Sequence, residues 1–393
     1  MIGLVGKPNA GKSTFFSAAT HSDVEIANYP FTTIGSNKGI AYIRDKCPHT
    51  ELGVKCDPGN SACIEGTRFV PIEIIDVAGL VPDAYKGKGL GNEFLDQLRQ
   101  ASSLIHVIDS SGKTNLEGEP LEKGEHNPKK DVEFLEKEIQ MWIYGMLEKK
   151  WGSMKRNIEA DRQNTTDALT DALTGVGVKK PDINKAIKQI QKNPEKWKKT
   201  QLKKFSKEIV EITKPTMLSL NKADVADQAD IKKLEEIDKL SVPTSAQAEL
   251  VLKNMDKKEI IDYVPGEDDF QIKKPKKLNK KQKKGLKRIK TKILDKYGST
   301  GVQECLEKSI RELLNKIVVY PVENENNYTN KQGEVLPDAY LLKKGSTPED
   351  LAYKVHSDIG NNFLHAINAK TGMRISNDHQ LENGDIIKII TSN

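Results

Sequence analysis

The stretch that decides the fold is Gly6-Lys7-Pro8-Asn9-Ala10-Gly11-Lys12-Ser13-Thr14, which directly follows the apolar residues 1–5. Its spacing, G-x-x-x-x-G-K-[ST], is typical of a loop that wraps phosphate groups with backbone N–H groups at the start of a helix. The glycines let successive N–H groups point inward at the β-phosphate. We therefore predict a strand, a nucleotide-binding loop over residues 6–14 and a helix after it.

Two side chains of this loop have expected chemical roles. Lys12 is predicted to bridge the β- and γ-phosphates, and the hydroxyl of Ser13 is predicted to ligate Mg²⁺. Asp76-Val77-Ala78-Gly79 follows the apolar residues 71–75, so Asp76 lies at a strand end, where it can anchor Mg²⁺ through water. The N–H of Gly79 can then approach the γ-phosphate.

A threonine upstream is expected to complete the metal shell. The segment Tyr29-Pro30-Phe31-Thr32-Thr33 supplies two candidates, of which we favour Thr33. Together with Lys12 and Gly79 it makes up the predicted catalytic set. The alternative for Thr33 is a plain loop threonine.

A second cluster predicts recognition of the base. Asn221-Lys222-Ala223-Asp224 follows another apolar strand. A carboxylate at Asp224 accepts hydrogen bonds from guanine N1–H and the 2-amino group, and adenine has no such pair of donors. Lys222 is expected to lay its alkyl stem along the base. The backbone of Ser245-Ala246-Gln247 is expected to donate to guanine O6.

Short apolar segments alternate with helical or loop stretches, as in a parallel sheet covered by helices. The predicted strands are Met1–Val5, Val70–Ile75, Leu104–Ile108, Met217–Leu220 and Ser241–Pro243. We predict an α/β fold with a mostly parallel sheet over residues 1–128 and 209–305. Residues 306–393 are predicted to form a small β-grasp-like domain, whose clearest signal is a helix start at Thr347-Pro348-Glu349-Asp350.

Residues 129–208 interrupt the strand pattern and are predicted to form a helical insertion. Val132, Leu135, Ile139, Trp142 and Met146 recur at steps of three and four residues, which places them on one helix face. The segment is interpreted either as a packing module or as an arm that binds a partner.

The composition excludes a membrane-spanning chain. Of the 393 residues, 36% are hydrophobic and 30% charged, and no run of eighteen apolar residues is present. The start of the sequence lacks the pattern of a signal peptide, and four cysteines do not suggest a disulfide framework. We therefore expect a cytoplasmic protein.

Three of the cysteines lie close together in the sequence with a histidine. Cys47, His49, Cys56 and Cys63 are the residue types of a four-ligand zinc site, although no C-x-x-C pair is present. Free thiols are the alternative. His106, within an apolar run, is expected to be a core histidine rather than a catalytic one.

The segment Lys273–Lys290 is strongly basic, with eleven lysines and arginines among eighteen residues and no acid. A charge run is commonly a solvated surface, but cations at this density repel each other unless an anion lies nearby. RNA, bound through its phosphates, is the anion that we favour. Aromatic residues are absent from the run, so stacking on bases is not supported.

Taken together, these motifs resemble the Obg-like GTPases, specifically the YchF-related branch in its archaeal form. The resemblance is carried by Gly6–Thr14, Tyr29–Thr33 with Ile34, Asp76–Leu80 followed by Gly87-Lys88-Gly89-Leu90-Gly91, Asn221–Asp224 and a C-terminal TGS-like domain. It implies a Mg²⁺-dependent GTPase that binds GTP and GDP and acts on ribosomes, rRNA or tRNA. Many YchF relatives have Glu at the position of Asp224 and prefer ATP, so Asp224 favours GTP.

Two residues bear on the rate of hydrolysis. Leu80 occupies the position at which Ras-like enzymes have a water-orienting Gln, so intrinsic turnover is expected to be slow. Asn9 lies where some cation-activated GTPases hold K⁺ against the phosphates. It predicts stimulation by K⁺, and a loop-shaping asparagine is the alternative.

The leading hypothesis is a GTPase that acts as a conformational switch on ribosomes. The alternative is a stress-related or housekeeping nucleotidase with a protein partner and no RNA contact. A third possibility is a non-enzymatic RNA-binding protein whose nucleotide site only supports its structure.

Overall fold

The computed structural model describes residues 1–20, 37–79, 82–83, 85, 91–122, 125–160, 162–190 and 193–392. Contacts within the chain group these residues into two units. Unit 1 contains residues 1–19, 37–39 and 74–305, and unit 2 contains residues 20, 40–73 and 306–392, with the gaps given above. Each unit is described separately.

In the described part of the chain, the larger sheet has seven strands in the order β2-β4-β1-β5-β6-β7, and β3 pairs with β4. Its strands are β1 (Ile2–Val5), β2 (Lys38–Lys46), β3 (Ala62–Ile64), β4 (Thr67–Asp76), β5 (Ser103–Asp109), β6 (Thr216–Asn221) and β7 (Ser241–Pro243). β1 pairs in parallel with β4 and β5, and the parallel pairing continues to β6 and β7. The predicted mostly parallel α/β sheet is confirmed.

The register of the sheet positions the nucleotide motifs. Leu4 of β1 lies opposite Asp76 of β4, and Asp109 of β5 lies opposite Asn221 of β6. These strands end at the same edge of the sheet, where ligands of open α/β sheets bind. The loop after β1, the carboxylate after β4 and the amide after β6 are therefore expected to meet, although they are far apart in the sequence.

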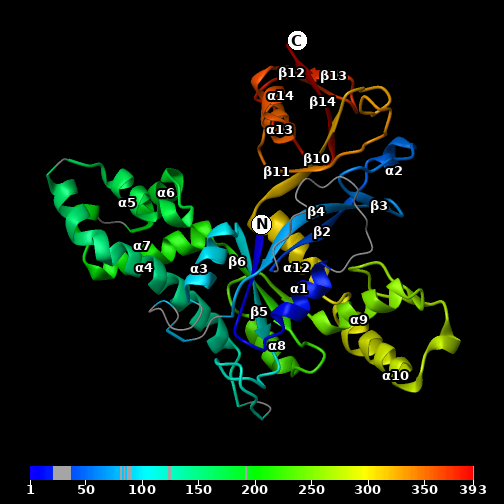
Figure 1. Cartoon of the computed structure of the whole chain (residues 1–393), viewed down its shortest axis with the longest axis horizontal. Coiled ribbons are helices and arrows are strands. Elements are labelled where there is room, and N and C mark those ends of the chain that lie inside the picture. The colour runs from blue at the N-terminus through cyan, green and yellow to red at the C-terminus, as the bar shows by residue number, and fades with distance from the viewer. Residues whose placement is uncertain are drawn as a thin grey trace. The chain divides into compact units, whose positions relative to one another are not determined.

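The helices of unit 1 are labelled in Figure 1 where there is room. Those of unit 1 outside the insertion are α1 (Lys12–Thr20), α3 (Gly91–Gln100), α8 (Gln228–Glu235), α9 (Ala246–Lys257), α10 (Lys280–Ile289) and α11 (Asp295–Tyr297). Shorter elements complete it: β8 (Ile261–Asp262), β9 (Gln271–Ile272), η4 (Pro275–Lys277) and η5 (Lys290–Leu294). One core cluster joins strands β5 and β6 to α8 and α10 through buried aliphatic side chains that include Leu218, Leu234 and Leu286.

The predicted helical insertion is present as a helical lobe (Figure 1). Its elements are α4 (Lys129–Glu159), α5 (Thr165–Leu173), η2 (Thr174–Val176), α6 (Lys180–Ile190), η3 (Pro194–Lys196) and α7 (Lys199–Thr213). The lobe has its own core, in which Trp197 and Phe205 lie with ring centroids 5.1 Å apart. At the base of α4, Leu135 and Ile139 pack instead with the sheet-side core. The insertion is therefore a packed module in its own right.

The C-terminal part of unit 2 is built on a mixed five-stranded sheet in the order β11-β10-β14-β12-β13, counted over the described residues. Its strands are β10 (Lys316–Val322), β11 (Tyr340–Lys343), β12 (Phe363–Asn368), β13 (Met373–Ile375) and β14 (Asp385–Thr391). The helices of unit 2 are α2 (His49–Leu52), α13 (Pro348–Val355) and α14 (Ser357–Asn361), and α12 (Val302–Lys308) and η6 (Ser309–Leu313) lead into β10. The Thr347 side chain accepts a hydrogen bond from the Asp350 backbone N–H, so the predicted helix start is confirmed.

Among the residues described, none of the helices combines the length and the apolar character needed to cross a bilayer.

Candidate functional site

The loop between β1 and α1 is shaped by two glycines with positive φ. Gly6 has φ 152°, and a Cβ there would lie 2.5 Å from the Val107 carbonyl oxygen. Gly11 has φ 98°, and a Cβ would lie 2.3 Å from Asn221 Nδ2. A side chain at either position would collide with fixed atoms, so both glycines are required for this loop path.

The side chain of Lys7 is directed into the interior instead of toward the loop concavity. Its Nζ donates to the Thr114 carbonyl oxygen at 2.7 Å and lies 2.9 Å from Asp131 Oδ2. His126 Nε2 contacts the other oxygen of Asp131 at 2.6 Å. Burial raises the pKa of Asp131, and Lys7 and His126 oppose that rise. The sequence motif predicted a nucleotide-binding position at Lys7 but did not reveal this buried network.

Asn9 fixes the tip of the loop. It has φ 60°, a conformation that asparagine tolerates better than most residues, and its Nδ2 donates to the Gly118 carbonyl oxygen at 2.9 Å. Gly118 has φ 84°, and a Cβ there would lie 2.7 Å from the Cβ of Pro8. The turn at Gly118 thus supports the loop from outside, and no motif in the sequence indicated it.

The predicted magnesium ligands Ser13 and Asp76 are brought together. Ser13 Oγ donates to Asp76 Oδ2 at 3.1 Å, whereas Asp76 Oδ1 is buried with no hydrogen-bond partner among the described residues. A buried carboxylate oxygen without a donor beside a hydroxyl is the hard oxygen donor set that Mg²⁺ prefers. These residues therefore fit the ion.

Lys12 lies next to the same carboxylate. Burial lowers the pKa of Lys12 and raises that of Asp76, and the charge of each partner opposes the shift of the other. A Cβ added to Gly79 would lie 3.4 Å from Lys12 Nζ, so the backbone of Gly79 is close to this lysine. The predicted residues Thr33, Leu80, Gly87 and Gly89 lie outside the described residues.

Asn221 joins the phosphate loop to the base-recognition segments. Its Nδ2 donates to the Ala10 carbonyl oxygen at 2.9 Å, and its Oδ1 accepts from the Ala246 N–H at 3.1 Å. Lys222, with φ 62°, donates from Nζ to the Asn9 carbonyl oxygen at 2.8 Å. The side chains after β6 therefore bind the loop after β1 directly, as the register of the sheet requires.

Asp224 lies beside the start of α9. Ser245 Oγ donates to Asp224 Oδ1 at 3.2 Å and accepts from the Ala248 N–H at 3.4 Å, so Ser245 caps α9 and orients the carboxylate. Arg288 of α10 reaches the other oxygen of Asp224 at 3.4 Å. The carboxylate thus has one partner in the predicted site and one in the basic segment.

Asp109 contacts the predicted site residue Lys222, and the motifs did not reveal it. It ends β5, is fully buried, and accepts from Lys222 Nζ at 2.8 Å and from Thr114 Oγ1 at 2.9 Å. Burial pushes the pKa of Asp109 up, but hydrogen bonds from Lys222, Ser111 and Thr114 outweigh it and leave the pKa below its usual value. The only signal in the sequence was an acid directly after an apolar strand.

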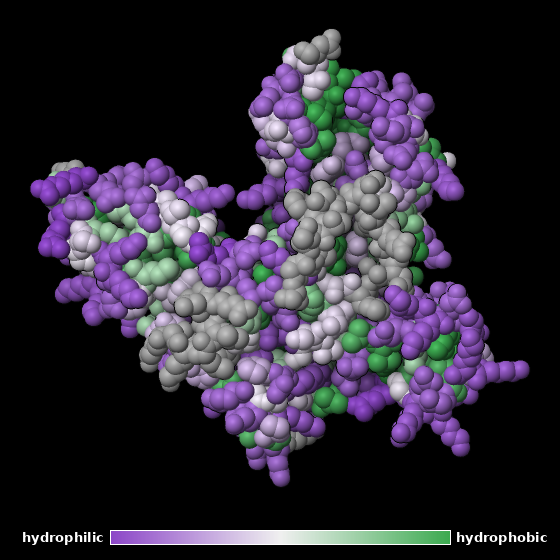
Figure 2. Space-filling view, viewed as in Figure 1, coloured by the Kyte–Doolittle hydropathy of each residue, from purple (hydrophilic) through white to green (hydrophobic). Residues whose placement is uncertain are grey.

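The basic segment is partly neutralised. Four of its cations, Lys273, Lys274, Arg288 and Lys290, pair with acids. The others have no carboxylate oxygen within 4 Å in the described chain: Lys276, Lys277, Lys280, Lys281, Lys283, Lys284 and Lys287. Each of these seven is exposed, and Figure 2 shows hydrophilic side chains gathered over this region.

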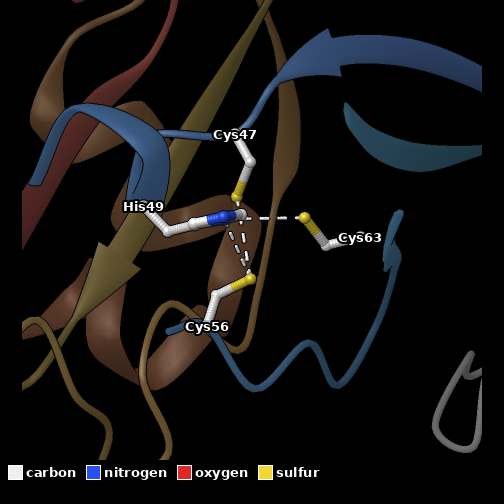
Figure 3. A group of neighbouring side chains, drawn as sticks. All are labelled: Cys47, His49, Cys56 and Cys63. Carbon is white, nitrogen blue, oxygen red and sulfur yellow. Dashed lines mark hydrogen bonds between the residues drawn. The ribbon is translucent and has the colours of Figure 1, made fainter. Parts of the chain in front are cut away.

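The cysteines and histidine predicted as zinc ligands also come together. Cys47, His49, Cys56 and Cys63 have ligand atoms that all lie within 4.8 Å of one another (Figure 3). Burial raises the pKa of Cys47 and, together with the neighbouring thiols, raises the pKa of Cys63 to about 12. His106 is buried in β5, as predicted, and Cys305 is buried near Thr244.

Comparison with protein families divides the chain into three matched regions. Residues 1–143 match the family described as 50S ribosome-binding GTPase. Residues 219–324 match the G4 motif-containing domain of the Obg-like GTPase YGR210-like family, and residues 325–391 match the TGS domain.

Several proteins are similar over most or all of the chain. A GTP-binding protein of Methanocaldococcus jannaschii is 50% identical, with 100% of this chain and 99% of the relative covered. A GTP-binding protein of Schizosaccharomyces pombe is 37% identical, with 90% of each chain covered. The crystal structure of a GTP binding protein from Pyrococcus horikoshii OT3 is 40% identical, with a TM-score of 0.80, and covers 100% of this chain and 99% of that one.

A more distant relative has a more specific name. The ribosome-binding ATPase YchF of Bacillus subtilis is 35% identical over 167 residues, which is 42% of each chain.

Proposed function

Because the chain belongs to the Obg-like GTPase family of YchF-type proteins, as its motifs predicted, we propose that it hydrolyses GTP to GDP and phosphate and switches conformation as it does so. The observation that carries the proposal is the position of Asn221. Its amide hydrogen-bonds to the Ala10 carbonyl oxygen and to the Ala246 N–H, so one side chain would hold the proposed phosphate-binding and base-binding segments at a fixed spacing.

The proposed base is guanine. Asp224 is held at its position by Ser245, and an aspartate there satisfies the N1–H and 2-amino donors of guanine together. With adenine the carboxylate would stay without these partners, which is why the site is proposed to reject ATP. This distinguishes the chain from its YchF relative, whose name describes an ATPase.

The proposed reaction is in-line attack of water on the γ-phosphate. Mg²⁺ held near Ser13, Asp76 and Thr33 would neutralise charge on the β- and γ-phosphate oxygens. Lys12 would bring a positive charge to the same oxygens, and its half-buried position would strengthen that interaction because fewer water molecules screen it than at an exposed site. The backbone N–H of Gly79, whose backbone lies close to Lys12, would approach the γ-phosphate.

Turnover is proposed to be slow and to depend on an activator. Leu80 cannot orient water through its alkyl side chain, and GTPases without a supplied arginine turn over at roughly 10⁻⁴ to 10⁻² per second. The proposed switch elements are the segments around Thr33 and after Gly79, which would order with GTP and relax with GDP.

Potassium is one proposed activator. Asn9 lies at the loop tip, where a monovalent cation can contact the phosphates of a bound nucleotide. Its Nδ2 is used to hold Gly118, which also supports a loop-shaping role. Equal rates of GTP hydrolysis in NaCl and KCl at the same ionic strength would exclude K⁺ as an activator.

The proposed partner is the ribosome, which would place the protein in the cytoplasm. Its support is the name of the B. subtilis relative, the ribosome-binding description of the family that matches residues 1–143, and seven exposed lysines without an acidic partner among the residues that the structure describes. Lysines that neutralise phosphates release counterions, so binding to rRNA or tRNA through this surface should weaken steeply with salt.

The experiment that tests the function is GTP turnover by the purified protein in KCl, with and without ribosomes, and with ATP as the specificity control. GTP preferred over ATP and stimulated by ribosomes supports the whole proposal. If ribosomes do not change the rate of GTP turnover and no salt-sensitive cosedimentation with ribosomes is seen, the enzymatic activity is still supported. That result favours the alternative of a nucleotidase with a protein partner. Preference for ATP would show that the role assigned to Asp224 is wrong.

A further inference from the structure

The four side chains drawn in Figure 3 converge on a single point from separate parts of the chain. Cys47 follows β2, His49 begins α2, Cys56 lies in the loop after α2, and Cys63 lies in β3. Cys47 Sγ is 3.9 Å from Cys56 Sγ, and His49 Nδ1 is 3.2 Å from Cys56 Sγ and 3.5 Å from Cys63 Sγ. None of these residues takes part in the proposed nucleotide chemistry.

These separations match a tetrahedral metal site. With zinc–sulfur bonds of about 2.3 Å and zinc–nitrogen bonds of about 2.0 Å, a tetrahedron places two sulfurs roughly 3.8 Å apart and a sulfur and a nitrogen roughly 3.5 Å apart. The observed distances are close to both values. A disulfide between Cys47 and Cys56 would leave His49 and Cys63 without a reason to face the same point.

Hydrogen bonds of the local backbone position the turn that carries Cys47 and His49. The Cys47 N–H donates to the Gly66 carbonyl at 2.9 Å, and Thr50 Oγ1 donates to the Cys47 carbonyl at 2.9 Å. Gly66 has φ 84°, and a Cβ there would lie 2.8 Å from Thr50 Cγ2. The turn of β3–β4 is thus packed against the turn that carries Cys47 and His49.

The charge beside the cluster also fits a metal bound by three thiolates. Zn²⁺ with three thiolates and a neutral imidazole carries a net charge of −1. The guanidinium of Arg68 lies beside it, with Nη1 4.0 Å from Cys47 Sγ. Arg68 is fully buried, and within the described residues no carboxylate oxygen lies within 4 Å of its guanidinium. Buried charges are normally paired, and a zinc–thiolate centre supplies the missing negative charge.

The chain between the second and third cysteines binds the TGS domain. The Asp57 N–H donates to the Val335 carbonyl at 2.8 Å, and the Gly59 N–H donates to the Pro337 carbonyl at 2.8 Å. The Asn60 side chain accepts from the Ala339 N–H at 2.9 Å. Arg68 Nη2 donates to the Pro337 carbonyl at 3.0 Å and also to that of Leu336. All these residues belong to unit 2.

We propose that Cys47, His49, Cys56 and Cys63 form a structural zinc site, and that the metal fixes residues 57–60 in the conformation that pairs with residues 335–339. The ion is closed off by four protein ligands, so its role is structural and not catalytic. It stabilises the contact between the segment after β2 and the TGS domain, independently of the proposed GTPase activity.

The test is metal analysis of the full-length protein, expressed in medium supplemented with zinc. Wild type should retain about one zinc ion per chain after exhaustive dialysis, and Cys56→Ser should lose it. Cys305→Ser is the matched control, because Cys305 is a buried thiol outside the cluster and its substitution should leave the zinc content unchanged. Wild type without bound metal, or equal zinc in Cys56→Ser, would overturn the site.

Two measurements on the wild-type chain keep the test decisive if Cys56→Ser fails to fold. Replacement of the metal by Co²⁺ should give the visible absorption of a tetrahedral cobalt–thiolate centre, and absence of that spectrum overturns the ligand set. Removal of the metal by a chelator should speed hydrogen exchange at the N–H groups of Asp57, Gly59 and Ala339, but not in the helices α5 and α6 of the insertion. Unchanged exchange at the three N–H groups would overturn the proposal that the metal fixes residues 57–60 against residues 335–339.

Discussion

Lys7 of the phosphate loop and Asp131 in the first turn of α4 form a buried ion pair, with Nζ 2.9 Å from Oδ2 and both side chains 1% exposed. The pair connects the loop that is proposed to bind the nucleotide with α4, the long first helix of the insertion. Lys7 also donates to the Thr114 carbonyl oxygen, and Oδ1 of Asp131 also contacts His126 Nε2. The helical insertion is therefore anchored on the nucleotide site itself.

Asp131→Ala should destabilise the protein strongly, because it leaves the ammonium group of Lys7 buried without a counter-charge. Removal of one partner of a buried pair costs about 3–5 kcal/mol, whereas exchange of both for apolar residues is often close to neutral. The double variant Lys7→Met/Asp131→Leu should therefore recover most of the lost free energy of unfolding, as measured by urea denaturation. Glu159→Ala, which removes the exposed pair with Lys155, should have no measurable effect. A double variant as unstable as Asp131→Ala would show that the pair does not act as a unit.

Asp224→Asn should change the base that the site accepts. An asparagine amide offers a donor where guanine also has donors, so affinity for GTP should fall by at least about tenfold, and XTP, with an acceptor at C2, should become the better ligand. Competition against a fluorescent nucleotide measures both affinities. The exposed Asp238→Asn serves as the charge-matched control and should keep the GTP preference. Retained discrimination for GTP in Asp224→Asn would exclude Asp224 as the residue that recognises the base.

Gly118→Ala should weaken nucleotide binding, although Gly118 lies outside the recognised motifs. Its φ of 84° disfavours alanine, and the added Cβ would lie 2.7 Å from Pro8 Cβ, so the phosphate loop must shift. Gly298→Ala is the matched control, because Gly298 has φ 78° with no atom within 4 Å of the added Cβ. Both variants should lose roughly 1 kcal/mol of stability from backbone strain, but only Gly118→Ala should lose GTP affinity, by about tenfold or more. Equal GTP affinity in the two variants would contradict a supporting role for this turn.

Most of the sheet could be predicted because its central strands are buried on both faces and therefore form continuous apolar runs. The strand β2 escaped prediction, since its burial alternates and it ends in Arg44, Asp45 and Lys46. The strands β12 and β13 are half-exposed or very short, so their sequences lack a strong period. Local sequence patterns identify a strand reliably only where the burial of that strand requires apolar residues at regular positions.

The candidate site also has one part that could be predicted from the sequence and another that could not. The phosphate-loop, Asp76 and Asn221–Asp224 motifs could be recognised because their chemistry demands particular residues at a particular spacing. The contact between Lys7 and Asp131 joins residues 124 positions apart in the sequence. It depends on the path of the chain after β5, which the spacing of sequence motifs does not predict. The four residues of the proposed zinc site could be picked out by their residue types, but their convergence depends on the antiparallel pairing of β3 with β4.

Three lysines of α10 should govern binding to ribosomes. Lys280, Lys284 and Lys287 are exposed and have no acidic partner in the described part of the chain. They recur at helical spacing, so they share one face of α10. Their joint substitution by Gln should weaken cosedimentation with ribosomes and lower the slope of log affinity against log salt by about two to three. The matched control is the triple Gln variant at Lys196, Lys198 and Lys204, which are exposed lysines of the insertion, and it should bind as wild type. Equal losses in both triple variants would point to net charge instead of a defined surface.

His106 should make the protein less stable in acid. Burial in β5, together with the charges of Lys239, Lys7 and Lys12, lowers the pKa of His106 to about 3. Between this value and the ordinary value of 6.5, the unfolded chain binds a proton at His106 that the folded chain does not, so the free energy of unfolding falls as the pH falls, by up to about 1.4 kcal/mol per pH unit. His106→Leu abolishes that titration, so its urea-derived free energy should depend less steeply on pH between 6 and 4, whatever its absolute stability. His379→Gln, at a partly exposed position of unit 2, should keep the wild-type slope. An unchanged slope in His106→Leu would mean that this histidine is protonated in the folded protein.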